Sequence, residues 1–182
     1  MWREFKPALL FLARFVGVYV LGNILYGLYI ASFQNEADTV TELVSHHSCY
    51  VLNQFGENVQ PVRNTQGPTV FIQTQEKITL NIFEGCNGVN VIIVFVAFMV
   101  AFGGPLKKMA WYVPLGILTI HIFNLARISL LFYVAQYDQE LFYYVHKYFF
   151  TAALYLVVFA LWAIWVMKFT QKPKQEVNAQ TQ

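Results

Sequence analysis

Long apolar blocks alternate with shorter polar segments along this chain. The four apolar blocks occupy about residues 8–33, 88–104, 109–134 and 148–169. A membrane-spanning helix needs about 20 consecutive and predominantly apolar residues. The second block, with 17 residues, lies at the short limit of that range. The pattern predicts an all-α polytopic membrane protein, in which four transmembrane helices form a single membrane domain over residues 1–182.

The first apolar block has the charge pattern of a secretory signal, because Arg3 and Lys6 precede it. We reject that interpretation on length. The uncharged part, residues 15–33, is 19 residues long, and its end is a weak cleavage site. Arg14 lies just inside the block and can extend its charged group toward the lipid headgroups. The first block is therefore predicted to be a span.

The segment 34–87 is too long to be a mere connection between two spans. Its first part, about residues 36–55, predicts an amphipathic helix near the membrane that ends at Gly56. The apolar positions of this helix recur at helical spacing: Val40, Leu43, Val44, His47 and Val51. Residues 69–73 and 77–83 then predict the two strands of a β-hairpin, because apolar and polar side chains alternate in the second. We expect a small external α+β insertion between the first two spans.

The flanking Lys and Arg residues predict the orientation in the membrane. With the N-terminus in the cytoplasm, eight of the twelve basic residues lie inside and three lie outside, while Arg127 lies within a span. Eight of the ten acidic residues then lie outside. Both termini are therefore expected in the cytoplasm, and residues 34–87 and 135–147 on the external side. The polar tail, residues 172–182, is expected to be disordered.

The composition agrees with a membrane protein and excludes several other classes. Hydrophobic residues make up 57% and charged residues 12% of the chain, whereas soluble domains carry about 25% charged residues. A net charge of +2 is too small to attract a nucleic acid. Two cysteines cannot form a disulfide scaffold. The membrane lipid is the one partner that the composition itself implies.

Arg127 is the strongest single functional signal in the sequence. Its position, 16 residues after Trp111, places it roughly 24 Å from the inner face at about 1.5 Å per residue. An arginine inside a span costs about 2.5–3.5 kcal/mol on insertion scales, so it normally faces a partner or a wet cavity. A purely structural alternative is an arginine that joins helices through Asn124 or an acidic side chain.

Cys86 precedes the second span and has a glycine on either side, Gly85 and Gly88, with Asn87 between. Glycines allow a substrate backbone to approach closely. A helix N-terminus and a cationic neighbour are expected to lower the pKa of this thiol, while Glu84 opposes them unless it is paired. Two alternatives remain: an inert buried cysteine, and a disulfide with Cys49 on the oxidising side of the membrane.

The four histidines have different predicted roles, according to their positions along the chain. His146, at the outer start of the fourth block, could accept a proton from the thiol and return it to a leaving amine. His121 is expected near the middle of the membrane, in a structural role within the bundle. His46 and His47 come before Ser48 and Cys49, but this spacing does not fit a closed zinc site. No metal and no cofactor are predicted.

The order of these residues resembles that of a known family. Glu84-x-Cys86-x-Gly88 before a span, Asn124-x-x-Arg127 in the outer half of a later span, and His146 at the start of the next are similar to the exosortase/archaeosortase family. The short chain and the large external hairpin resemble the exosortase F type. The sequence departs from the family at Asn87, where Ser or Thr is often found, and in having four spans where the larger members have about eight.

This resemblance implies a membrane-embedded cysteine transpeptidase of the bacterial inner membrane, with its active site on the external, periplasmic side. Such enzymes cleave a C-terminal sorting signal of exported proteins, which consists of a short motif, a hydrophobic helix and a basic end, and transfer the product to a cell-surface acceptor. By position, Cys86 matches the nucleophile, Arg127 the family arginine and His146 the third catalytic residue. Glu84, Asn87, Gly88 and Asn124 are expected to bind substrate or support the site.

Two other functions are compatible with the same residues. One is a non-catalytic anchoring or assembly factor that binds a partner through the external insertion. The other is a membrane protease with the same nucleophile and with water as the acceptor. The sequence leaves open the substrate motif, the acceptor and the oligomeric state.

Overall fold

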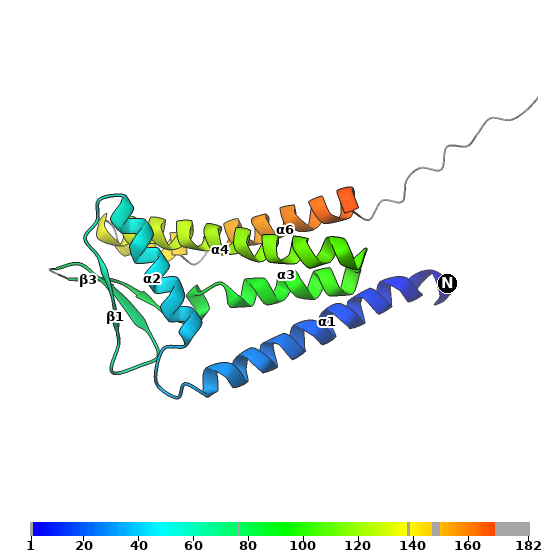
Figure 1. Ribbon diagram of the computed structural model, residues 1–182, viewed down its shortest axis with the longest axis horizontal. Coiled ribbons are helices and arrows are strands. Elements are labelled where there is room, and N and C mark those ends of the chain that lie inside the picture. Colours follow the sequence, from blue (N-terminus) through cyan, green and yellow to red (C-terminus); the bar gives the residue numbers. More distant parts are fainter. Residues whose placement is uncertain (1, 76, 138, 147–149, 170–182) are drawn as a thin grey trace, which may run out of the picture.

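The computed structural model is a mostly helical molecule with one small sheet (Figure 1). It describes residues 2–75, 77–137, 139–146 and 150–169. The predicted disordered tail, residues 172–182, lies outside these residues, as does Lys147. The elements in chain order are α1 (Trp2–Ala31), α2 (Thr39–Gln54), β1 (Gln60–Arg63), β2 (Val70–Gln73), β3 (Ile78–Ile82), η1 (Glu84–Cys86), α3 (Val89–Phe102), α4 (Leu106–Tyr137), α5 (Gln139–Tyr144) and α6 (Phe150–Phe169).

Three helices are long and apolar enough to cross a membrane, at Phe5–Ala31, Leu106–Tyr137 and Thr151–Phe169. They correspond to the first, third and fourth predicted spans. The second predicted span, 88–104, forms α3, which is apolar but has only 14 residues and so a length of about 21 Å. α3 packs beside α1 and α4 (Figure 1). Four spans therefore stay a prediction, with α3 as the short member.

The transmembrane helices approach closely where α3 meets glycines of its neighbours. A Cβ atom built on Gly116 of α4 would lie 2.3 Å from the ring of Phe95, and one on Gly22 of α1 would lie 2.8 Å from Ile93. Small residues at such positions let membrane helices pack closely. On the other side of α3, Trp165 of α6 is fully buried and donates a hydrogen bond to the Gly103 carbonyl over 3.1 Å.

The predicted amphipathic helix is present as α2, but it buries a different face from the one expected. Asp38 caps its N-terminus by accepting hydrogen bonds from the backbone of Val40 and Thr41. The buried residues are Thr41, Val44, Ser45, Ser48, Cys49 and Leu52. Leu43, expected on the apolar face, is 51% exposed. The helix packs against α4 and the sheet through small polar side chains, so hydrophobicity alone misplaced its inner face.

The predicted two-stranded hairpin is part of a sheet with three strands in the order β1-β2-β3. β2 and β3 form the expected antiparallel pair, and β1 adds an antiparallel strand that the sequence analysis missed. β1 contains Pro61 and has no alternating apolar pattern. The register of β2 and β3 shifts at Thr79: Ile72 is opposite Leu80 while Gln73 is opposite Ile78.

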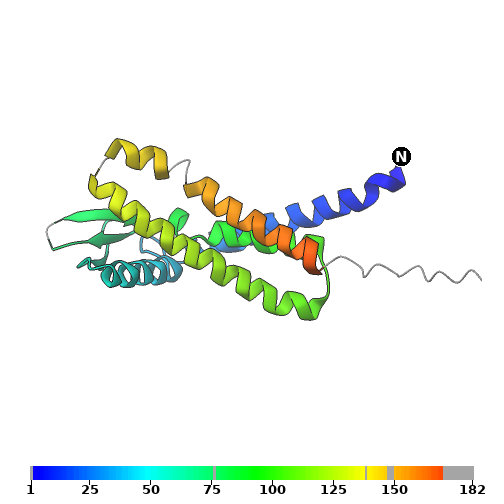
Figure 2. The ribbon, with the colours of Figure 1, turned by 90° about the horizontal axis from the view of Figure 1, so that it is seen from above.

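α4 is longer than the predicted third span and continues beside α2 and the sheet (Figure 2). The connection between α4 and α6 therefore begins later than the predicted loop 135–147, and it contains α5. The ring of His121 lies 3.0 Å from that of His47 on α2, measured between Nε2 and Nδ1. His121 was expected near the middle of the membrane, bonded within the bundle; its partner is instead on the insertion. α2 therefore packs against α4 as far along that helix as His121.

Candidate active site

Cys86 lies at the junction between the three-stranded sheet and α3. β3 ends at Ile82, and the chain then forms the short helix η1, in which the Cys86 backbone N–H donates to the Phe83 carbonyl over 2.7 Å. Gly88 follows with a φ of 84° and begins α3. This left-handed conformation suits glycine, because it has no Cβ. The turn places the Cys86 side chain inside the protein, where the residue is 5% exposed.

The thiol of Cys86 faces the ring of His146, with 3.8 Å between Sγ and Nε2. His146 lies just after α5, and its ring stacks on Phe142, one helical turn earlier, at 5.6 Å between ring centroids. The two residues are 60 positions apart in the sequence. A thiol and an imidazole nitrogen at this distance can exchange a proton after a small adjustment, because such bonds often tighten only when substrate binds.

Asn124 and Arg127 lie close to Cys86, one helical turn apart on α4. The Asn124 amide donates to the Cys86 carbonyl over 2.9 Å. Its oxygen accepts a hydrogen bond from Arg127 Nη1 over 3.3 Å. Arg127 is 8% exposed, and its Nε has no partner among the residues that the structure describes. A buried guanidinium with an unused donor can bind an oxygen that is not part of the protein.

The electrostatics of the pair differ from the sequence prediction. Burial raises the pKa of the Cys86 thiol above its usual value, although the nearby charge of Arg127 and a backbone hydrogen bond from Phe83 lower it. The expected net lowering was wrong, because desolvation of the buried thiol is the largest effect. Burial lowers the pKa of His146, and the Arg127 charge adds to this. At neutral pH the resting pair is a neutral thiol beside a neutral imidazole, which is free to accept a proton.

Asn87 links the site to two other elements, whereas Glu84 does not contact it. The Asn87 amide donates to the hydroxyl of Tyr26 on α1 over 2.7 Å and to that of Thr41 on α2 over 3.0 Å. Its oxygen accepts from the Val89 backbone over 3.0 Å. Glu84 forms no ion pair with any residue in the described ranges. A pairing of Glu84 with Arg127 or His146, the condition under which it would not oppose ionisation of the thiol, is therefore not seen among these residues.

A cavity of about 490 Å³ opens onto the thiol and the imidazole. Its walls come from the sheet, from α4 and from the α5 region: Thr79, Leu80, Asn81, Ile82, Phe83, Cys86, Ile128, Leu131, Ala135, Phe142 and His146. Most of these side chains are apolar. Ligand pockets typically have volumes of about 300–1,000 Å³ and mostly apolar walls. The cavity therefore has the size and chemistry of a ligand pocket beside a thiol and an imidazole.

The comparison with protein families agrees with this geometry. The family model described as Transmembrane exosortase (Exosortase_EpsH) matches residues 5–166. The chain belongs to the transmembrane exosortase family. No curated protein and no solved structure matches it. The match includes almost every element from α1 to α6, so this exosortase is a multi-pass membrane protein. Its resemblance to the F type stays a prediction.

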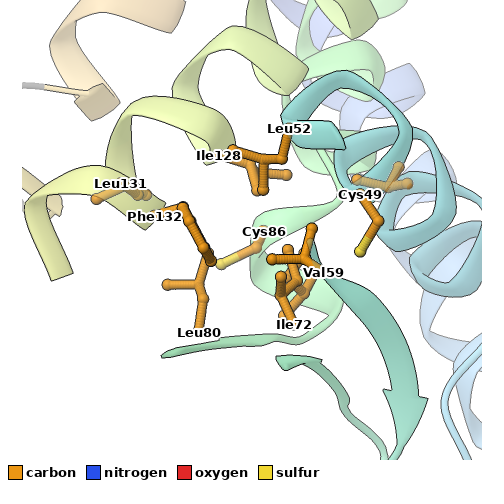
Figure 3. Close-up of a cluster of buried hydrophobic side chains, with 11 residues drawn as sticks. Cys49, Leu52, Val59, Ile72, Leu80, Cys86, Ile128, Leu131 and Phe132 are labelled. Carbon is orange, nitrogen blue, oxygen red and sulfur yellow. The ribbon is translucent and has the colours of Figure 1, made fainter. Parts of the chain in front are cut away.

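The second cysteine of this exosortase does not pair with the first. Cys49 and Cys86 are both free and belong to the same buried apolar cluster. Figure 3 shows the Cys86 sulfur directed toward Leu80 and Phe132, away from Cys49. Burial raises the pKa of Cys49 to about 12. This thiol is therefore protonated and inert at neutral pH.

Sequence reasoning placed the three central residues but missed what surrounds them. Phe142, which orients the His146 ring, could have been found from its position four residues earlier on the same face of a helix. Tyr26 and Thr41 gave no signal, because their contact with Asn87 joins three distant segments. The residues His46 and His47 do not form a metal site with neighbours: within the described residues, no group of three or more ligands is present.

Proposed function

We propose that this exosortase is a membrane-embedded cysteine transpeptidase. It cleaves a C-terminal sorting signal of exported proteins and transfers them to a cell-surface acceptor. The observation that supports this most strongly is the approach of Cys86 Sγ to His146 Nε2, at 3.8 Å, in an apolar cavity next to a buried arginine. A nucleophile, a base and a cation together are the groups that acyl transfer requires.

In the first step, His146 Nε2 accepts the proton of the Cys86 thiol while the sulfur attacks a backbone carbonyl of the substrate. A carbon–sulfur bond forms, and the carbonyl oxygen becomes an oxyanion. Collapse of this intermediate breaks the peptide C–N bond, and the imidazolium returns its proton to the leaving amine. The products are a thioester on Cys86 and the free C-terminal peptide, which contains the hydrophobic helix and basic end.

In the second step, the hydroxyl or amine of an acceptor attacks the thioester. His146 removes the proton of the acceptor, and the proton then returns to the thiolate as the carbon–sulfur bond breaks. Arg127 stabilises the oxyanion in both steps or holds the substrate carbonyl, using the Nε–H that has no partner among the described residues. Asn124 positions both reacting centres, because it bonds to the Cys86 carbonyl and to Arg127.

The surroundings of the site support transfer over hydrolysis. The cavity walls are mainly apolar, and a site that excludes water favours an acceptor bound in place. We infer that the site faces the external side of the bacterial inner membrane and that both termini are cytoplasmic, as the distribution of basic residues predicts. The substrate helix would then lie in the same bilayer, with its basic end toward the cytoplasm.

Co-expression with an exported protein that ends in a hydrophobic helix and a basic cluster tests this proposal. Cys86→Ala should abolish processing while the protein still inserts and accumulates. Cys49→Ala is the matched control, because this buried thiol is free and is not among the residues that line the cavity, and it should process normally. Mass spectrometry of the new C-terminus then separates the two enzymatic outcomes. An added group supports transfer, whereas a free carboxylate identifies a protease.

The non-catalytic alternative has some support in the external lobe, which exposes apolar side chains. Tyr50 of α2 is 67% exposed and Ile78 of β3 is 53% exposed. A partner-binding factor would tolerate Cys86→Ser and lose function on Ile78→Ser. The transpeptidase proposal predicts the greater loss from Cys86→Ser, because an alcohol in this site is a much weaker nucleophile than a thiol.

A further inference from the structure

The cavity beside Cys86 is bounded by a strand edge. Five successive residues, Thr79 to Phe83, line it. Successive side chains of a strand point to opposite faces of the sheet, so a cavity above one face would be lined by alternate residues only. A cavity that touches five in a row must lie along the backbone, at the side of β3 that faces away from β2. α4 and the α5 region form the opposite wall.

This edge of the sheet has no neighbouring strand in the part of the chain that the structure describes. β3 is the last strand in the order β1-β2-β3. Its outward backbone N–H and C=O groups are therefore available as hydrogen-bonding partners. The opposite edge differs, because β1 contains Pro61, which lacks an N–H group. The sheet thus has an edge interrupted by proline and an edge that borders the cavity.

Thr79 is a second and independent sign that this edge binds something. It is the residue that the register of β2 and β3 skips, and so it forms a bulge. Bulges are common next to active sites, where they redirect a side chain. Thr79 lines the cavity, and its hydroxyl is buried and has no hydrogen-bond partner among the described residues. A buried hydroxyl without a partner is destabilising, and a bound ligand that hydrogen-bonds to it removes this cost.

The strand edge also leads directly to the nucleophile. Three residues separate Ile82 from Cys86, and the same cavity touches both Thr79 and Cys86. Five residues of strand extend for about 17 Å at roughly 3.3 Å per residue. A chain lying along this length would bring one of its carbonyls to Cys86 while its backbone pairs with β3.

We propose that the cleaved segment of the substrate binds as an extended β-strand along the free edge of β3, with the Thr79 hydroxyl bonded to its backbone. This inference rests on the proposed function, in which Cys86 attacks a peptide carbonyl. Recognition is then mainly through the substrate backbone, with apolar side chains accommodated by Leu131 and Phe142 on the opposite wall. Addition of a strand to a sheet edge is a general mode of peptide binding.

Peptides that alkylate Cys86 test this inference without knowledge of the natural substrate. The full-length protein in detergent is treated with the chloromethyl ketone of acetyl-Ala-Val-Ala-Ala, with versions methylated at one backbone nitrogen at a time, and with iodoacetamide. Labelling of Cys86 is followed by mass spectrometry. Methylation at a nitrogen that pairs with β3 should slow labelling about five- to tenfold, because it removes a single hydrogen bond and changes no side chain.

Two sets of variants locate the bound peptide. Thr79→Val should slow the labelling of Cys86 by the peptide reagent several-fold and leave its labelling by iodoacetamide unchanged. Thr119→Val is the control: the Thr119 hydroxyl bonds to Leu115 of its own helix, and its loss should change neither labelling rate. Benzoylphenylalanine in place of Asn81, on the β3 edge, should cross-link to the attached peptide. The same group in place of Val62, on β1, should not.

The outcomes separate this inference from the proposed function. Labelling that depends on backbone methylation, with a cross-link from position 81, supports strand addition. Labelling by the peptide that is insensitive to every methylation, or a cross-link from position 62 in place of 81, overturns strand addition and leaves the nucleophile intact. Reaction of Cys86 with iodoacetamide but not with the peptide also overturns it. Failure of Cys86 to react with either reagent rejects the proposed function and the inference together.

Discussion

Replacement of Arg127 by glutamine should separate reactivity from stability. Arg127 is buried, makes a single described hydrogen bond of 3.3 Å, and has an Nε without a described partner. An arginine within a membrane helix costs about 2.5–3.5 kcal/mol on insertion scales. One hydrogen bond offsets little of the cost of burying this arginine. Arg127→Gln should therefore leave the thermal unfolding temperature unchanged or raise it. A buried charge retained at a cost to stability is typical of a functional residue.

The same substitution should make Cys86 less reactive. The Arg127 charge lowers the pKa of the thiol and that of His146, so its removal raises both. Loss of an opposite charge at close range typically changes the ionised fraction about tenfold or more. Alkylation of Cys86 by iodoacetamide at pH 7.5 should therefore slow by about tenfold or more. The acid limb of the pH–rate profile for processing should move to higher pH, because His146 must lose its proton to act as base.

The matched control for this experiment is Arg63→Gln. Arg63 has a side chain that is 67% exposed and is paired with Glu42 of α2, so the same charge is removed where solvent screens it. This variant should leave both the alkylation rate and the pH profile unchanged. An Arg127→Gln protein that alkylates at the rate of the unsubstituted protein, with an unmoved acid limb, would refute the electrostatic role. A large fall in its unfolding temperature would instead indicate a structural arginine.

Three further predictions concern the surroundings of the site. Gly88→Ala should lower the free energy of unfolding, measured by denaturant titration, by about 1–2 kcal/mol, because the φ of 84° at this position is unfavourable for alanine. Gly17→Ala is the control and should not lower it, because a Cβ atom at Gly17 meets open space. Asn87→Ala loses three hydrogen bonds and should cost about 2–3 kcal/mol by the same titration, whereas Asn23→Ala, bonded within its own helix, should cost less than about 1 kcal/mol. Cys49, with a pKa of about 12, should stay unlabelled by iodoacetamide at pH 7.5 in the folded protein and become labelled after denaturation, as followed by mass spectrometry. Labelling of Cys49 in the folded protein would contradict this prediction.

The sequence predicted the long elements of the fold because each has a strong local signal. The apolar blocks at 8–33 and 148–169 became α1 and α6, and the alternation around Ile78 became β3. β1 has no such signal: it has four residues, includes a proline, and exists because β2 pairs with it. The inner face of α2 was misplaced for a related reason. Its small polar residues pack against α4, a preference that depends on the partner helix and not on local hydrophobicity.

The candidate site was likewise only partly predictable from the sequence. Cys86, Arg127 and His146 could be placed at one level from their distances to the ends of the apolar blocks, and the structure brings the first and last to 3.8 Å. The direction of the Cys86 pKa could not be predicted, because it depends on the balance between burial and charge. Nor could the bulge at Thr79, which arises from the register of two strands.

The most direct test of the mechanism is to look for the acyl-enzyme. The full-length protein is mixed with a tailed exported substrate, quenched in acid within the first turnover, digested and analysed by mass spectrometry. The mechanism predicts a thioester between the shortened substrate and Cys86, which hydroxylamine releases and which is absent in Cys86→Ala. Processing of the substrate by Cys86→Ala at the normal rate, with no adduct on the unsubstituted protein, would contradict it.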